Sequence, residues 1–125
     1  MTVARQRLGR RAETIVAERL RREGWRVVAR NARTWHGEID LIGIDGTALA
    51  FVEVKAGMAG SSHGPERPAL AVGPAKRQRL RRLARAWLAA GDRLPPHGQL
   101  RFDVVGVTFG RDGRVVAYEH LRNAF

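Results

Sequence analysis

The sequence contains no cysteine among its 125 residues. Neither a disulfide framework nor a thiolate-bound zinc site is therefore possible, and the chain suits a reducing compartment such as the cytoplasm. A chain of this length buries a sizeable core without disulfides or a structural metal. Because it shows no internal repeat and no linker, we expect one domain over residues 1–125.

Long hydrophobic runs are also missing. No apolar stretch approaches the roughly 18 residues that indicate a transmembrane helix, and no basic-then-apolar leader opens the chain. We therefore expect no membrane span, no export signal and a cytoplasmic location.

Acidic residues and lysine are both scarce. Twelve Asp and Glu oppose 23 Lys and Arg, which gives a net charge of +11. Such a domain is attracted to nucleic-acid phosphates or anionic lipid, although a basic charge balance also occurs in proteins that bind neither. Only Lys55 and Lys76 are lysines, and Arg replaces this compact charge poorly. These two positions are therefore candidates for a specific role.

Hydrophobic periodicity predicts the element order α-β-β-β-α-β-β. One helix covers residues 3–23 and ends at Gly24, and another covers roughly 74–90, with Pro74 near its start and Gly91 past its end. The second helix carries an apolar stripe formed by Leu80, Leu83, Ala84, Trp87 and Leu88. Strands are predicted over 25–31, 38–44, 48–56, 101–109 and 114–120. Segment 57–74 is rich in Gly, Ser and Pro and predicts a flexible loop, either substrate-facing or plain surface. Residues 48–55 are apolar on both faces, as in a central strand, so the fold class is α/β, or α+β in looser terms.

Asp45-Gly46 predicts a two-residue hairpin turn between the second and third strands. That register pairs Asp40 with Phe51 and Glu38 with Glu53, and opposed residues share a face. Four charged side chains then project to one side of the hairpin: Glu38, Asp40, Glu53 and Lys55. Three acids this close repel one another, and a single lysine ammonium balances only one of them.

The acid cluster predicts a divalent metal site. Carboxylate oxygens suit Mg²⁺, or the similar Mn²⁺, with water and a substrate phosphate completing the shell. The expected ligands are Asp40, Glu53 and the carbonyl of Val54. Lys55 would orient the attacking water, and Glu13 would act through a water or as a hydrogen-bond acceptor. A structural ion pair between these acids and Lys55 or an arginine is the alternative.

Several motifs in a fixed order resemble one protein family. The first helix carries G-x-x-x-E-x-x-x-A-x-x-L, followed by G-E-I-D at residues 37–40 and F-V-E-V-K at residues 51–55. This set is similar to the YraN-like family of small bacterial proteins, which is classed with the PD-(D/E)XK nuclease superfamily and related to Holliday-junction resolvases. The similarity continues through residues 71–76, 101–105 and 120–125, so it covers nearly the whole chain.

The resemblance implies a restriction-endonuclease-like core, with a mixed central sheet flanked by helices. The superfamily's catalytic signature falls on Asp40, Glu53 and Lys55. Glu13 matches the acid of the first helix, and Lys76 matches a basic residue that contacts substrate phosphate. The implied activity is metal-dependent hydrolysis of phosphodiester bonds.

One position departs from the family pattern. Members usually carry an Arg two residues after the lysine of E-V-K, where this chain has Gly57 after Ala56. The leading interpretation is an endonuclease acting on DNA, with branched DNA as one candidate substrate. A non-catalytic nucleic-acid-binding module of the same fold is the alternative, and an adaptor that docks on an acidic protein is a third class.

The second helix and three isolated residues add further hypotheses. We expect phosphate contacts from Lys76, Arg77 and Arg81. Trp35 could stack on a base, whereas Asp103 is expected to pair structurally with an arginine. A two-fold symmetric DNA junction would favour a homodimer.

Overall fold

The computed structural model describes residues 3–60, 67–91 and 94–125. Within them lie the helices α1 (Val3–Arg22) and α2 (Pro74–Ala90) and a short 3-10 helix, η1 (Pro68–Leu70). The strands are β1 (Arg26–Thr34), β2 (Gly37–Asp45), β3 (Ala48–Met58), β4 (Gln99–Phe109) and β5 (Val115–Leu121). The predicted order of elements is confirmed, and α2 coincides with its predicted range. In the described part of the chain, neither helix is long and apolar enough to cross a membrane.

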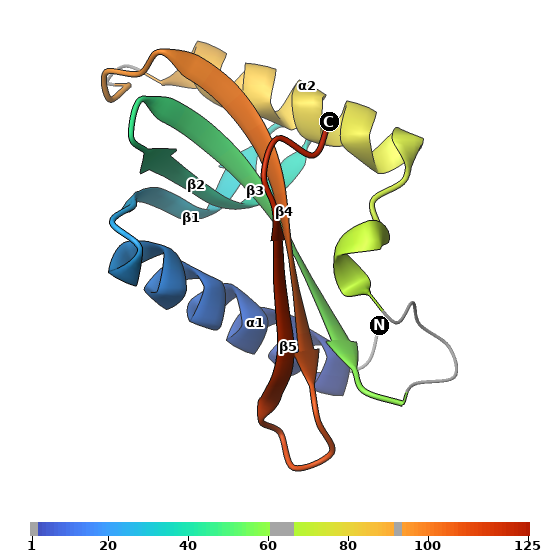
Figure 1. The fold of residues 1–125 in the computed structure, drawn as a ribbon. Coiled ribbons are helices and arrows are strands. Elements are labelled where there is room, and N and C mark those ends of the chain that lie inside the picture. The colour runs from blue at the N-terminus through green and yellow to red at the C-terminus, as the bar shows by residue number, and fades with distance from the viewer. Residues whose placement is uncertain (1–2, 61–66, 92–93) are drawn as a thin grey trace.

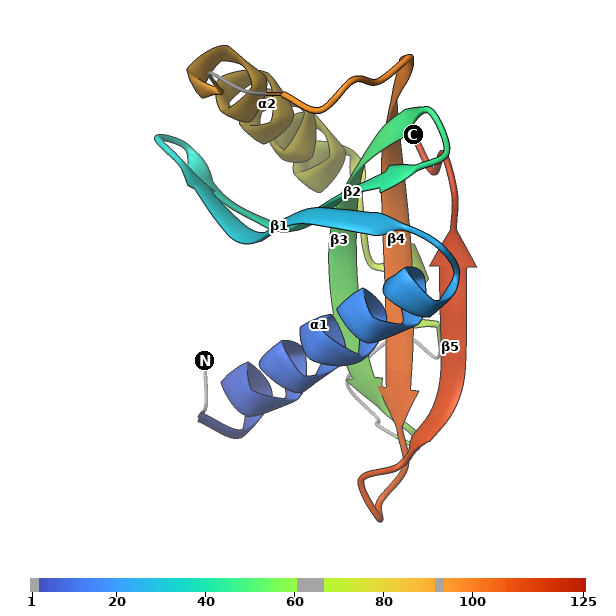
Figure 2. The ribbon, with the colours of Figure 1, turned by 90° about the vertical axis from the view of Figure 1, so that its left-hand side faces the viewer.

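The strands form one mixed sheet in the order β1-β2-β3-β4-β5. Only β3 and β4 run parallel, because the chain crosses over through α2 between them. Figure 1 shows α2 and α1 on opposite sides of the strongly twisted sheet. In Figure 2 the β1–β2 hairpin projects away from β4 and β5, between the α1 and α2 layers.

β3 is covered on both faces, which explains why its sequence is apolar on both faces. On one side, Val16 and Leu20 of α1 belong to the same buried cluster as Val52. On the other side, Leu83 of α2 belongs to the cluster that contains Phe51. Since side chains alternate along a strand, the residues after Phe51 at every second position face the α2 side. The predicted central strand and the apolar stripe of α2 are confirmed.

The predicted register of the β2–β3 hairpin is wrong by one turn position. Asp45 pairs with Ala48, so the turn residues are Gly46 and Thr47. Gly46 has a φ of 60°, which suits a glycine as the first residue of a two-residue turn. Phe51 therefore lies opposite Ile42 rather than opposite Asp40. Each residue's partner moves by two positions, which by itself preserves the predicted faces of the paired residues. Beyond the ladder β2 twists, because Ile39 packs in the cluster of α2 although Leu41 packs in the cluster of α1.

The predicted loop over residues 57–74 is shorter in the structure. β3 continues to Met58 because its parallel ladder with β4 extends to the pair Met58 and Phe109. Within the same range, η1 packs on the sheet with Pro68 and Ala69 buried. Residues 61–66, on which the flexibility prediction also falls, lie outside the described residues.

Asp103 is fully buried in β4 and is held by several donors. Arg101 donates from Nε to Oδ1 and from Nη2 to Oδ2, both at 2.9 Å. The backbone N–H of Asn123 donates to Oδ1 at 3.0 Å. His120 Nε2 lies 2.8 Å from Oδ2. Burial raises the pKa of Asp103, but His120, Arg101 and the Asn123 amide outweigh it and lower the pKa overall. The predicted structural pairing of Asp103 with an arginine is confirmed.

Candidate active site

The candidate site lies at a fork in the sheet, where β2 separates from β3. The β2–β3 ladder runs from the pair Asp45 and Ala48 to the pair Leu41 and Val52. The next residue of β2 is Asp40, and its Oδ2 accepts a hydrogen bond of 2.8 Å from the backbone N–H of Val54. The Asp40 side chain thus binds the β3 backbone just beyond the last pair of the ladder, which fixes its position.

Two other acidic side chains, Glu53 and Glu13, lie close enough to Asp40 to affect its pKa. Burial and, next, the neighbouring Glu53 charge raise the pKa of Asp40, which overall reaches about 7. The Val54 N–H and the Lys55 ammonium act in the opposite direction, and the Glu13 charge raises the pKa further. The sequence-predicted acids Glu13, Asp40 and Glu53 are therefore within electrostatic range of one another.

Glu53 and Lys55 come from the face of β3 that points toward α2. Their side chains form an ion pair with 3.1 Å between Lys55 Nζ and Glu53 Oε1, and both are mostly covered. Burial lowers the pKa of Lys55, but Glu53, contact with Lys76 and the Asp40 charge together raise it overall. Lys55 is therefore a stable cation. The ion pair that formed the alternative interpretation is present between Glu53 and Lys55, whereas Asp40 bonds to a backbone amide.

Glu13 reaches the fork from α1. With the Asn31 amide turned so that its nitrogen faces the acids, Asn31 donates to Glu13 Oε2 and to Glu38 Oε1, each at 2.9 Å. Burial and the Glu38 charge raise the pKa of Glu13, whereas Arg30, Asn31 and Arg10 counteract this rise. Glu38 thus lies near Glu13, and in the β1–β2 ladder it is opposite Arg33. The prediction that Glu38 lies opposite Glu53 is wrong, because it depended on the incorrect register.

Asn31 is a site residue that the sequence interpretation missed. Its φ of 50° lies in the left-handed region, which Asn adopts more readily than most residues. The residues on either side of it, Arg30 and Ala32, turn to opposite layers: Arg30 bonds Thr14 of α1, and Ala32 packs in the cluster of α2. An asparagine as the last residue of the predicted strand was the available signal for this local twist.

The predicted phosphate-binding residues of α2 differ in their surroundings. Lys76 lies at the site: contact with Lys55 and repulsion from its charge lower the pKa of Lys76, with burial as a smaller cause. Arg77 donates from Nε to the carbonyl of Val72 at 3.1 Å. The guanidinium groups of Arg77 and Arg81 lie over the Phe125 ring, at 5.5 and 5.4 Å from its centroid. Both arginines remain exposed, and their contacts are with Val72 and Phe125.

The oxygen donors at the fork fit a cation such as Mg²⁺. Among the described residues, no group of three or more His, Cys, Asp or Glu side chains is arranged to hold a metal ion. Mg²⁺, however, commonly binds through one or two carboxylates and completes its shell with water and phosphate. In the hydrogen bond and the ion pair given above, Asp40 uses Oδ2 and Glu53 uses Oε1, so each carboxylate has a second oxygen that could bind a cation. The donor set therefore suits a two-carboxylate site and not an all-protein cage.

The absence of the usual family Arg at Gly57 agrees with the packing around this position. A Cβ at this position would lie 2.7 Å from Cγ of Pro68, which is buried in η1. Next to Lys55 on β4, a Cβ at Gly106 would lie 2.6 Å from the backbone nitrogen of Ala69. η1 thus packs directly on β3 and β4, and it fills the space into which an Arg at position 57 would project.

Comparisons with known proteins identify relatives over nearly the whole chain. The model of a family described as "Uncharacterised protein family UPF0102" matches residues 12–107, which include every predicted metal-binding and catalytic residue. A "UPF0102 protein" of Streptomyces griseus is 48% identical over 121 residues, covering 95% of this chain and 96% of the relative. A "UPF0102 protein" of Anaeromyxobacter dehalogenans is 45% identical, with 97% of this chain and 85% of the relative covered. Another, from Pelotomaculum thermopropionicum, is 39% identical over the full length of both chains.

Proposed function

We propose that this chain, which belongs to the uncharacterised protein family UPF0102, is a metal-dependent endonuclease that hydrolyses phosphodiester bonds in DNA. The observation that carries the proposal is the arrangement at the fork. Asp40 is held against β3 by the Val54 amide, next to the Glu53–Lys55 ion pair. Two crowded carboxylates and a lysine on a chain of net charge +11 suit a polyanionic substrate. The proposed fold assignment is the restriction-endonuclease-like core that the sequence motifs resemble.

Asp40, Glu53 and the carbonyl of Val54 would hold the Mg²⁺ or Mn²⁺ ion. When bound, such an ion would neutralise negative charge on the phosphodiester oxygens and would lower the pKa of a bound water molecule. The metal ion would stabilise the two charged carboxylates, which are partly buried and repel each other. Burial and this repulsion together raise the pKa of Asp40.

Lys55 and Lys76 provide the fixed positive charge of the site. The raised pKa of Lys55 keeps its ammonium charged beside the position of the scissile phosphate, where it orients the attacking water and stabilises the charge that develops in the transition state. Lys76 enters from the first turn of α2 and contacts a neighbouring phosphate. Glu13 completes the site from the α1 side, through the network that it shares with Asn31.

Cleavage assays test the proposal directly. The purified protein is incubated with linear, flapped and four-way DNA over a titration of Mg²⁺ and Mn²⁺. Asp40→Asn keeps an oxygen to accept the Val54 hydrogen bond but removes the charge, and it should abolish cleavage while leaving DNA binding nearly intact. Asp112→Asn is the matched control, since Asp112 is an exposed acid in the β4–β5 turn. Cleavage that survives Asp40→Asn would refute the assignment.

The packing at Gly57 favours a second candidate, a non-catalytic nucleic-acid-binding module. Pro68 occupies the space where the usual family Arg would extend, so whatever that Arg contributes must come from another residue or be absent. A binding module would retain salt-dependent DNA affinity but show no turnover with any of the metals and DNA forms. The same assay panel therefore separates the two candidates.

A further inference from the structure

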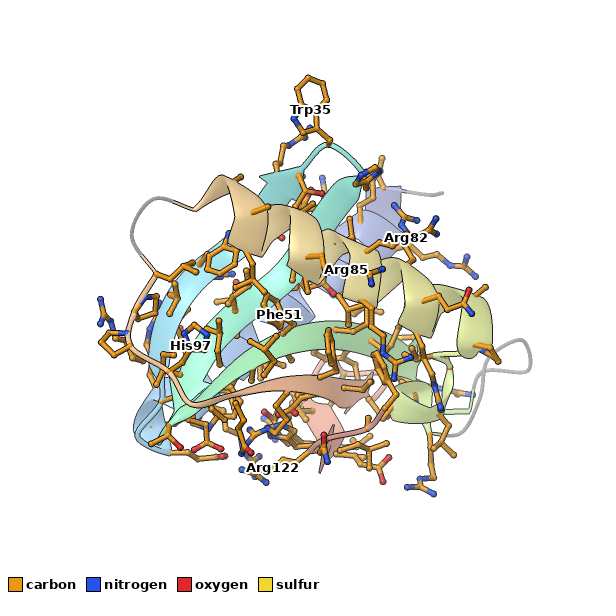
Figure 3. All side chains as sticks on the ribbon, turned by 90° about the horizontal axis from the view of Figure 1, so that it is seen from above. Trp35, Phe51, Arg82, Arg85, His97 and Arg122 are labelled. Atoms are coloured by element: carbon orange, nitrogen blue, oxygen red, sulfur yellow. The ribbon has the colours of Figure 1, made fainter. Side chains whose placement is uncertain are left out.

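Trp35 is at the tip of the β1–β2 hairpin and is 99% exposed. Figure 3 shows its ring pointing away from the body of the protein, beyond the end of the hairpin. A Trp side chain carries a large apolar surface, which usually contributes to a core or an interface. At this exposure it contributes nothing to the packing of the fold, so its ring is free to contact another molecule.

The hairpin tip that carries Trp35 is locally ordered. Thr34 Oγ1 donates to the carbonyl of Gly37 at 2.9 Å and accepts from the amide of His36 at 3.1 Å. Gly37 has a φ of 138°, and Arg79 Nη2 of α2 lies only 2.7 Å from where a Cβ would be. Because these contacts fix the backbone on both sides of Trp35, less backbone freedom is lost when the ring binds a ligand.

A row of cations connects the candidate active site with this tip. Lys76, Arg79 and Arg82 recur every three residues, so they lie on one side of α2. Lys76 contacts Lys55 at the fork, and Arg79 packs against the hairpin at Gly37. α2 contains six basic residues and no acid, and Figure 3 shows Arg82 and Arg85 on its outer side. We call Lys76, Arg79 and Arg82 the cationic row.

The spacing along β2 relates the tip to the site. Gly37, which pairs with Thr34 at the base of the turn, precedes Asp40 by three residues of strand. At about 3.3 Å per residue this corresponds to roughly 10 Å. Stacked nucleotides of one strand are about 3.4 Å apart, so the distance corresponds to about three nucleotides.

We propose that a DNA strand bound at the fork follows the cationic row to the hairpin tip, where Trp35 stacks on an unpaired base. This inference rests on the proposed function and specifies its substrate: DNA with unpaired bases about three nucleotides from the bound phosphate, as in a single-stranded flap or at a branch point. Phosphate contacts along the row provide affinity, and the aromatic face selects a base that is not enclosed in a duplex. An acidic protein would satisfy the row but gives no role to an exposed ring.

Binding measurements in EDTA test this inference without turnover. Fluorescence anisotropy compares a labelled single strand with a blunt duplex of the same sequence. Stacking on an aromatic residue accounts for about 5- to 150-fold in affinity. Trp35→Ala should therefore weaken single-strand binding by about that factor and change duplex binding less than about twofold, whereas Trp35→Phe retains most of the affinity. Val116→Ala is the matched control, because Val116 is an apolar side chain that is 58% exposed on β5.

A spectroscopic measurement reports the stacking itself. Trp25 is buried and Trp87 is partly buried in the core clusters, so Trp35 provides most of the solvent-accessible tryptophan emission. A single strand should quench the emission of the wild-type protein but not that of Trp35→Phe. Equal losses of single-strand and duplex affinity in Trp35→Ala, or no loss at all, would overturn the inference. So would a change in sedimentation of Trp35→Ala without DNA, because it would assign the tip to self-association.

The two proposals fail in different ways. If the protein binds single strands through Trp35 but never cleaves, the nuclease assignment fails and base stacking stands for a binding module. If Trp35→Ala cleaves flapped DNA as fast as the wild type at subsaturating substrate, the stacking inference fails and the nuclease assignment stands.

Discussion

The charge of Asp40 should destabilise the metal-free protein, and Asp40→Asn should relieve this. The pKa of Asp40 is raised from 3.8 to about 7, chiefly by burial and by the Glu53 charge. That difference of about three pH units corresponds to about 4 kcal/mol, since each unit is worth about 1.4 kcal/mol. Asparagine keeps an oxygen for the Val54 amide and carries no charge. In EDTA at pH 8, the variant should be more stable than the wild type by up to about 4 kcal/mol, or roughly 10 °C or more in Tm.

The pH dependence has a definite sign. Below about pH 4, Asp40 is protonated in both the folded and the unfolded protein, so its contribution to stability is fully present. Between about pH 4 and 7 the unfolded chain releases the proton while the folded protein keeps it. The wild type therefore loses stability relative to the variant by about 1.4 kcal/mol per pH unit, and the difference levels off above pH 7.

Urea denaturation followed by circular dichroism at pH 4, 6 and 8 measures this difference. Asp112→Asn, in the exposed turn, should show no comparable pH-dependent gain. Adding Mg²⁺ should stabilise the wild type, by about 2.7 kcal/mol at a concentration one hundred times its Kd, and should leave Asp40→Asn nearly unchanged. A variant that is no more stable than the wild type at pH 8, or a difference that does not vary with pH, would refute the reasoning.

Three other predictions concern packing, the buried polar network and the cationic row. Gly57→Arg should lower the free energy of unfolding by about 1–3 kcal/mol, because its side chain meets Pro68; Gly9→Arg, with no atom near its Cβ, is the control in urea denaturation. Asp103→Ala should destabilise the protein by about 3–5 kcal/mol by leaving buried partners without their acceptor, and an unchanged urea midpoint would contradict this. Arg82→Ser should reduce the slope of log affinity against log salt for DNA by about one, as seen in titrations at several salt concentrations; an unchanged slope would remove Arg82 from the DNA contact.

The helices, the strands and the faces of the residues paired in the β2–β3 ladder were predictable from local patterns. The stripe of apolar residues, with Pro74 at the start and Gly91 after the end, predicted α2 with its observed bounds. The face shared by Asp40 and Glu53 survived an incorrect turn, because moving a hairpin partner by two residues preserves the alternation of side chains. Such features follow from the periods of helices and strands, which the spacing of apolar residues reveals within a short stretch of sequence.

The precise environment of the site was not predictable in this way. The sequence motifs indicated Glu13, Asp40, Glu53 and Lys55, but only the packing of α1 against the sheet brings Glu13 into electrostatic range of Asp40. The left-handed residue Asn31 depends likewise on both layers, since its two neighbours in β1 turn to opposite helices.

The sequence by itself determined the order of the elements, the central position of β3 and the cluster of acids with Lys55. Tertiary structure alone decided that β2 separates from β3 at Asp40, that Pro68 fills the space beside Gly57, and that Arg79 supports the hairpin below Trp35. The physical reason is the separation along the chain over which each kind of interaction acts. Periodicity and turn chemistry act over a few residues, whereas these three features join segments distant in the chain whose contacts form only when the layers pack.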